Sequence, residues 1–214
     1  MKRKLIAALL FGATVLPALQ GCFPAVAAGV GTGVMAVLDR RTLGTQTEDE
    51  AIEWKAAARV ADKFGQRGHF NFTSFNRKAL VSGEAPSAEA KAEVAQIVAR
   101  IPNVSHVYDE VVVGPSSSLA ERSNDAFITS KVKSRSVDSG KFNPLQVKAV
   151  TEAGTVFLLG MVTQAEADSA IQIARTTSGV KKVVPLFEII SPEEARALDN
   201  QRSENKSGAG AVQP

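Results

Sequence analysis

Two stretches of this chain, Thr155-Val-Phe-Leu-Leu-Gly160-Met-Val162 and Lys78-Ala-Leu-Val-Ser-Gly83-Glu-Ala85, align with each other and decide the fold. Both have the length typical of a strand, and the first is a nearly continuous apolar run. Each is followed by an Ala- and Glu-rich stretch with helical character, residues 164–177 and 87–100. A repeated pair of this kind predicts one structural module that occurs twice in the chain.

The neighbours of these stretches extend the repeat in both directions. After each helix, a short breaker leads to a valine-rich strand. Before each of the two quoted stretches, the sequence has another strand and, ahead of that strand, another helix. The expected elements are helices 48–66, 87–100, 124–137 and 164–177, and strands 70–75, 78–85, 104–107, 145–150, 155–162 and 180–183. The order α-β-β-α-β therefore occurs twice. We expect an α+β protein of two tandem modules, each a three-stranded mixed sheet covered on one face by two helices.

The predicted boundaries divide the chain into a leader, a tether, two modules and a tail. The expected ranges are 1–21 for the leader, 22–47 for the tether and N-terminal segment, 48–114 and 121–190 for the modules, 115–120 for the linker and 191–214 for a mostly disordered tail with a short helix at 193–198. A module of about 65 residues buries only a marginal core, so we expect the two modules to pack on one another or to lean on another surface. Trp54 lies away from the apolar face of its helix and is our candidate for this contact, with packing at the edge of the core as the alternative.

Local sequence signals support these elements. Ile52, Ala56 and Val60 recur at helical spacing and form one apolar face. Thr163 and Glu166 have the spacing of a capping box, in which two side chains satisfy orphan backbone donors at the start of a helix. We expect Gly179 and Asn103 to take positive φ where the second helix of each module ends. Glu152 to Gly154 and Ser74 to Arg77 are the predicted hairpin turns. Gly83 and Gly160 are interpreted as strand ends, where the chain turns into a helix.

The N-terminus has the build of a secretory signal peptide. Lys2, Arg3 and Lys4 precede an apolar run from Leu5 to Leu19, and Gly21 precedes Cys22, the only cysteine of the chain. This end resembles the bacterial lipobox, which implies that Cys22 is acylated and becomes the first residue of the mature protein. A plain signal peptide with an incidental cysteine is the alternative. The apolar run is shorter than the roughly 20 residues that span a bilayer.

Composition excludes several classes of function. The leader holds three of the 25 Lys and Arg residues and none of the 22 Asp and Glu residues, so the mature chain is formally neutral and has no basic footprint for nucleic acid. His69 and His106 lack partners at metal-ligand spacing, and no serine, threonine or cysteine has a base positioned beside it. We therefore expect no enzymatic activity, catalytic residue, metal or cofactor.

The first helix of the second module carries the candidate binding surface. Ile128 and Val132 face the predicted core, whereas Phe127 is rotated by about 100° from Ile128 and points away from it. The side chains on or beside this outer face are Phe127, Ser130, Lys131, Ser134, Arg135 and Val137. A basic helix with an outward aromatic residue is typical of proteins that meet anionic phospholipid headgroups. Alternatively, Phe127 covers a sheet edge or the other module and the lysines only solvate the helix.

The repeated strand-glycine pattern followed by Gly179-Val180 resembles the BON domain (bacterial OsmY and nodulation). The segment 39–49 ahead of the first module, together with Phe127-Ile-Thr-Ser-Lys-Val132, Gly154 to Gly160 and Glu166, resembles the dual-BON outer-membrane lipoproteins of the DolP/YraP type. The second module matches this family better than the first, where Asn103 stands in place of the usual glycine.

This resemblance implies a lipoprotein that binds anionic phospholipid through its second BON domain and supports outer-membrane integrity, in a family linked to cell division. Phe23 follows the cysteine in place of the aspartate that retains lipoproteins in the inner membrane, which favours the periplasmic face of the outer membrane. The resemblance also implies palmitate among the lipids on Cys22. A different class of function stays open: a periplasmic adaptor that binds an outer-membrane assembly factor or a cell-wall or division regulator. The oligomeric state is undetermined by the sequence.

Overall fold

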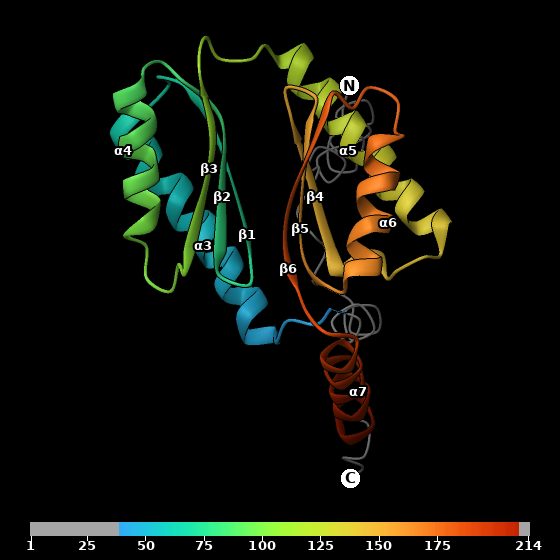
Figure 1. Ribbon diagram of the computed structural model, residues 1–214. Helices are drawn as coiled ribbons and strands as arrows, with labels where there is room; N and C mark the ends of the chain where they lie inside the picture. Colours follow the sequence, from blue (N-terminus) through green and yellow to red (C-terminus); the bar gives the residue numbers. More distant parts are fainter. Residues whose placement is uncertain (1–38, 210–214) are drawn as a thin grey trace, which may run out of the picture. The chain divides into compact units, whose positions relative to one another are not determined.

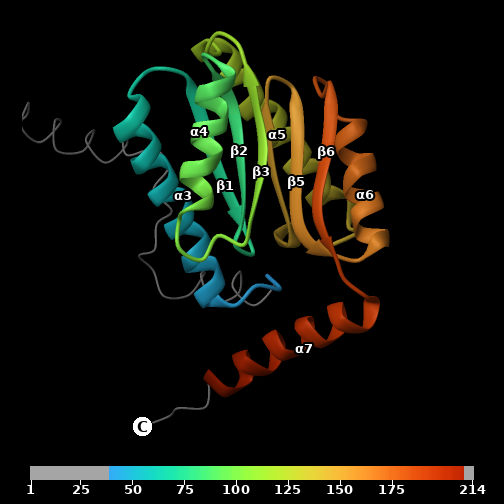
Figure 2. The same cartoon turned by 60° about the vertical axis from the view of Figure 1, so that its left-hand side comes forward.

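The computed structural model describes residues 39–209 and contains the expected order of elements twice (Figures 1 and 2). The elements are α3 (Leu43–Phe64), β1 (His69–Phe75), β2 (Lys78–Ala85), α4 (Ala88–Ala99), β3 (His106–Val113), α5 (Leu119–Ser139), the short 3-10 helix η2 (Pro144–Gln146), β4 (Val147–Glu152), β5 (Thr155–Val162), α6 (Gln164–Arg175), β6 (Lys182–Ile189) and α7 (Pro192–Ala209).

Each module is built on a three-stranded mixed sheet, as predicted. The strand order is β1-β2-β3 in the first sheet and β4-β5-β6 in the second. The hairpin strands pair antiparallel, and the last strand of each module pairs parallel to the middle one. The helix between the second and third strands makes this parallel pairing possible, because parallel neighbours need a crossover connection. The α+β class and the tandem arrangement are confirmed.

The two helices of each module cover one face of its sheet. In the first module Ile52, Ala56 and Val60 of α3 pack with Val94 of α4 and Val81 of β2. In the second, Ile128 and Val132 of α5 join side chains of α6 and the middle strand, namely Ile173, Ala174, Val156 and Leu158. The apolar stripes recognised from their helical spacing therefore form the two module cores.

The opposite faces of the two sheets pack on one another and form a third core. Phe75 and Leu80 of the first module are buried with Phe157 and Leu159 of the second. This explains why the middle strands β2 and β5 are buried on both faces. Contact between the modules was predicted, but through Trp54, and that residue assignment is wrong. Trp54 is 75% exposed, because the modules meet through their sheets while α3 lies on the far side of its own sheet (Figure 1).

The two repeated glycines lie inside strands and not at strand ends, which corrects their interpretation. A Cβ at Gly83 would lie 2.1 Å from the carbonyl oxygen of His69, and one at Gly160 would lie 2.3 Å from that of Gln146. Both glycines face the beginning of the first strand of their hairpin, where the two backbones approach too closely for any side chain. The repeat of these glycines reflects close backbone approach.

Several elements extend beyond their predicted bounds. Helix α3 begins at Leu43, where the Thr42 side chain caps it, and α5 begins at Leu119 behind a capping box formed by Ser118 and Glu121. The third strands start later than predicted and run further, to Val113 and Ile189. Helix α7 continues to Ala209, well past the predicted 193–198, because no proline or glycine interrupts the chain from Glu193 to Lys206.

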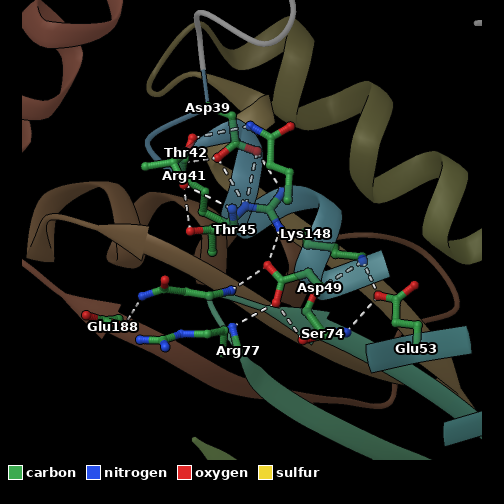
Figure 3. A network of polar contacts seen from close by, with 12 residues as sticks. Asp39, Arg41, Thr42, Thr45, Asp49, Glu53, Ser74, Arg77, Lys148 and Glu188 are labelled. Atoms are coloured by element: carbon green, nitrogen blue, oxygen red, sulfur yellow. Dashed lines mark hydrogen bonds and ion pairs between the residues drawn. The ribbon is translucent and has the colours of Figure 1, made fainter. Parts of the chain in front are cut away.

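Two adjacent arginines connect the start of α3 to both modules. Arg40 is 4% exposed, and its guanidinium donates to Glu166 at 2.8 Å, to the carbonyl oxygen of Met161 at 2.9 Å and to Asp199 of α7 at 3.0 Å. Arg41 turns to the first module instead, as Figure 3 shows, where it pairs with Asp39 at 2.6 Å and Asp49 at 2.8 Å. The segment ahead of α3 is therefore part of the folded body.

Candidate functional site

Helix α5, which carries the predicted surface, is fixed at both ends and along its inner face. The Ser118 and Glu121 side chains form the capping box at its start, and Gly140 ends it in the left-handed conformation. Ile128 and Val132, each 1% exposed, anchor it in the core of the second module. The outer face is therefore held in a defined orientation.

The buried Asp125 ties α5 to the hairpin beneath it. Its carboxylate accepts from the backbone N–H groups of Ala153 and Gly154, both at 2.9 Å. Ala153 and Gly154 have positive φ, so the carboxylate stabilises a tight turn that leaves its N–H groups without strand partners. Sequence reasoning missed this role, although an aspartate occurs at the matching place of both modules.

In the first module, Asp49 performs the same task with more partners. It accepts from the N–H groups of Asn76 and Arg77 at 2.8 and 2.7 Å and from the Ser74 hydroxyl at 2.6 Å, in addition to its ion pair with Arg41 (Figure 3). The alignment of the two repeats was the signal that could have revealed both aspartates.

The outer face of α5 exposes three large apolar side chains. Phe127 and Val137 are each 61% exposed, as the prediction requires, and Leu119, which was not predicted, is 76% exposed. Ser130 and Ser134 lie between them on the same exposed face. At 100° per residue these five positions fall within one side of the helix. Phe127 therefore covers neither a sheet edge nor the other module.

Two of the predicted cations lie along one flank of this face and contact the end of α6. Arg135 donates to the carbonyl oxygen of Ile173 at 3.0 Å and to the Thr177 hydroxyl at 2.8 Å. Lys131 donates to the carbonyl oxygen of Ser178 and lies 4.8 Å from the centre of the Phe127 ring. Cations at the C-terminal end of a helix satisfy its last carbonyl groups, so both side chains combine a structural contact with a positive charge along this flank of α5, and Lys131 places its charge beside Phe127.

The other flank carries two cations that were not among the predicted site residues. Arg122 and Lys133 line a cleft of about 440 Å³ between α5 and the first strands of both sheets. His69 lies in the same cleft, 3.4 Å from Arg122. Burial and the charge of Arg122 lower the pKa of His69, so its ring is neutral at pH 7. The exposed apolar face of α5 thus has cations on both sides.

Glu152 also lines this cleft. Its carboxylate accepts from the Asn71 side chain of the other module at 2.6 Å. Burial raises the pKa of Glu152, which the hydrogen bond from Asn71 partly opposes. His69 is the first residue of β1, and His106 is the exposed first residue of β3. Within residues 39–209, no group of histidines, cysteines and carboxylates could hold a metal ion. Cys22 and its leader lie outside the described residues.

The comparisons with known proteins agree with the duplicated architecture. The family model for the BON domain matches residues 48–115 and again residues 124–191. The chain is 38% identical over 186 residues to the outer membrane lipoprotein DolP of Haemophilus influenzae, which covers 86% of this chain and 95% of that protein. It is 30% identical over 155 residues to a 21 kDa hemolysin of Actinobacillus pleuropneumoniae, covering 72% of this chain and 80% of that protein. A solved C-terminal domain of CdsD from Chlamydia trachomatis is 15% identical over 64% of this chain and 96% of that domain, with a TM-score of only 0.27.

Two α-β-β-α-β modules joined through their sheets define a tandem BON-domain protein. The chain belongs to the BON-domain family and, within it, to the dual-BON outer-membrane lipoproteins of the DolP type. Among the helices of residues 39–209, none combines the length and the apolar character that crossing a membrane requires.

Proposed function

We propose that this protein binds anionic phospholipid through α5 of its second BON domain, as a non-enzymatic lipoprotein anchored through Cys22 to the periplasmic face of the outer membrane. The observation that carries the proposal is the exposed row of Leu119, Phe127 and Val137 between two flanks of cations. Exposed apolar side chains of this size are usual where a protein meets a membrane or a partner.

The two kinds of side chain have complementary roles at a membrane surface. Each Lys or Arg near an anionic bilayer contributes about 1 kcal/mol of attraction. Burying the Phe127 ring among the acyl chains adds roughly 1–2 kcal/mol. Ser130 and Ser134 leave room between the apolar side chains, so that phosphate groups can approach the helix backbone. Lys131 and Arg135 are held against the end of α6 and keep two positive charges along one flank of the helix, with that of Lys131 beside the ring.

The lipid anchor and α5 would then have different roles at the membrane. Two acyl chains already suffice for stable membrane binding. Contact through α5 therefore adds little to residence on the membrane and selects regions rich in anionic lipid. A protein that recognises such regions supports outer-membrane integrity by its position, without a chemical reaction.

Vesicle sedimentation tests the recognition step. The mature chain with Cys22→Ser, which cannot be acylated, is expected to bind phosphatidylglycerol vesicles and to bind phosphatidylcholine vesicles much more weakly. Combining Phe127→Ala with Lys131→Glu is expected to weaken binding to the anionic vesicles by about 300-fold, from one lost ring and one reversed charge. Unchanged binding of this double variant would show that α5 is not the lipid-binding element.

A further inference from the structure

Trp54 is the most exposed aromatic side chain of the first module, and no contact between the modules accounts for it. It is the only tryptophan of the chain and is 75% exposed on the outer side of α3. An indole ring left in water forgoes a large gain from burial. Tryptophan is also the residue type most enriched at the energetic centres of protein interfaces. Its position therefore points to a partner that covers it.

The surface beside Trp54 is a shallow groove of about 400 Å³ between α3 and β1. Its lining consists of Glu50, Glu53, Trp54, Ala57, Phe70, Asn71 and Phe72. Two of these side chains are acidic, and none of the described residues lining the groove is basic. Glu53 is partly neutralised, since its Oε1 accepts from Lys148 at 2.5 Å and from the Ser74 N–H at 2.7 Å. Glu50 is exposed and makes no hydrogen bond or ion pair within residues 39–209. The groove therefore favours a cation.

The floor of the groove is an open sheet edge. Strand β1 is the outer strand of its sheet, paired only with β2. The backbone of Ser74 points away from β2, because its N–H donates to Glu53 and its carbonyl oxygen accepts from Lys148. Backbone groups of alternate residues point to the same side of a strand. The N–H and C=O groups of Phe72 and Phe70 therefore also point outward, into the groove.

We propose that an extended, cationic segment of a partner protein adds to β1 alongside Phe70 and Phe72, beneath Trp54. Main-chain hydrogen bonds to an open strand edge are a recurrent way to bind peptides. A lysine or arginine of the segment would pair with Glu50 and stack on the indole ring. This inference goes beyond lipid binding by α5 and does not depend on it. The acidic lining disfavours an anionic membrane, which attracts basic surfaces.

Fluorescence of the single tryptophan reports directly on this groove. The mature chain with Cys22→Ser is titrated with a synthetic peptide that alternates lysine and valine, and separately with one that alternates glutamate and valine. We expect the lysine peptide to shift Trp54 emission to shorter wavelength and the glutamate peptide to leave it unchanged. Glu50→Lys is expected to weaken the lysine peptide about tenfold, and Glu50→Gln about threefold. Asp62→Lys, with the same charge change elsewhere on α3, is the matched control and should alter affinity less than twofold.

Amide chemical shifts provide a second measurement that does not use the indole. The lysine peptide should perturb the Phe70 and Phe72 amides, and Trp54→Ala should weaken this effect. The proposal is overturned if the lysine peptide does not bind at millimolar concentration, or if Glu50→Lys leaves the affinity for this peptide unchanged. It is also overturned if phosphatidylglycerol vesicles shift Trp54 emission, which would assign the groove to lipid, or if emission shifts with protein concentration alone, which would assign it to a second copy of this chain.

Discussion

Helices α3 and α5 occupy the same place in the two modules, yet they present opposite surfaces. Their inner faces match: Asp49 and Asp125 cap the hairpins, and Ile52 and Ile128 fill the cores. Arg59 and Arg135 also correspond, since each donates to a carbonyl oxygen at the end of the second helix of its module. The outer faces differ, with Trp54 beside Glu50 and Glu53 on α3, and apolar side chains between cations on α5.

This difference separates what a repeated fold must keep from what it is free to change. The inner face is constrained by packing and by backbone groups that require a partner. The outer face contacts only solvent, so duplication leaves it open to a new role. In our proposals, α5 faces lipid and α3 faces a basic protein segment. The following predictions test this division, from the largest expected effect to the smallest.

The strongest test of the shared scaffold is the pair of glycines in the middle strands. Gly83→Ala places a Cβ against the His69 carbonyl oxygen and also forces alanine to a φ of 111°. We expect a loss of about 4–5 kcal/mol in the free energy of unfolding, measured by urea denaturation. Gly160→Ala, which has the close contact without the positive φ, should lose about 1 kcal/mol less. Gly114→Ala, with open space around the new Cβ, is the control and should be nearly neutral.

Removing the capping aspartates should also cost more free energy of unfolding in the first module than in the second. Asp49→Ala leaves two backbone N–H groups and the Ser74 hydroxyl without their acceptor and removes one of the two carboxylates that pair with Arg41, so we expect a loss of about 3–4 kcal/mol. Asp125→Ala orphans two N–H groups and should lose about 2–3 kcal/mol. Asp138→Ala, at an exposed position of α5, should change the free energy of unfolding by less than about 0.5 kcal/mol. Equal losses for the two buried aspartates would contradict the view that Asp49 contributes more because it has more partners.

The outer faces are compared directly by vesicle binding. Phe127→Ala is expected to weaken binding to phosphatidylglycerol vesicles about tenfold, because the ring no longer enters the acyl region. Trp54→Ala is the matched change on α3 and should leave vesicle binding within about twofold. If Trp54→Ala has the larger effect, the assignment of lipid to α5 and of protein to α3 must be exchanged.

Acid should weaken the connection between α6 and the segment ahead of α3. Burial alone would raise the pKa of Glu166, but hydrogen bonds from Arg40 and Thr163 outweigh it and lower the pKa below the usual 4.5. The stabilisation from this carboxylate is complete above the unfolded pKa and is lost as pH falls through the lower folded pKa. Thermal unfolding from pH 7 to pH 3 should therefore show a smaller loss of Tm for Glu166→Gln than for the unaltered chain. Equal losses would mean that Glu166 contributes nothing to the acid response.

The sequence predicted the modules because their signals are local and occur twice. Apolar residues at helical spacing located α3 and α5, and the box of Thr163 and Glu166 located the start of α6, where the structure has it. Asn103 and Gly179 have positive φ, as expected. The same reasoning placed Phe127 and Val137 on an exposed face. Their contact with lipid stays a prediction, as does acylation of Cys22.

What the sequence did not predict depends on contacts between distant residues. Trp54 was assigned to the contact between modules because an aromatic residue on the outer side of a helix gives no sign of which surface is buried. The sheet faces form that contact through residues such as Leu80 and Leu159, whose burial on a second side is hidden inside apolar strands. Glu166, Met161 and Asp199, which bind Arg40, lie more than a hundred residues away from it, so no local pattern could indicate these contacts.

The position of Arg40 has a mechanical consequence. With Cys22 acylated, tension between the membrane and the protein would run along the 18 residues from Cys22 to Arg40, a path of at most about 60 Å. The load would meet Asp39 and Arg40 together. Asp39 is held by Arg41, which also pairs with Asp49 of the first module, and Arg40 is held by Glu166 and Asp199, so both modules would take up the load at once. Such a tether would strain the two modules together, so that tension would not pull one module away from the other.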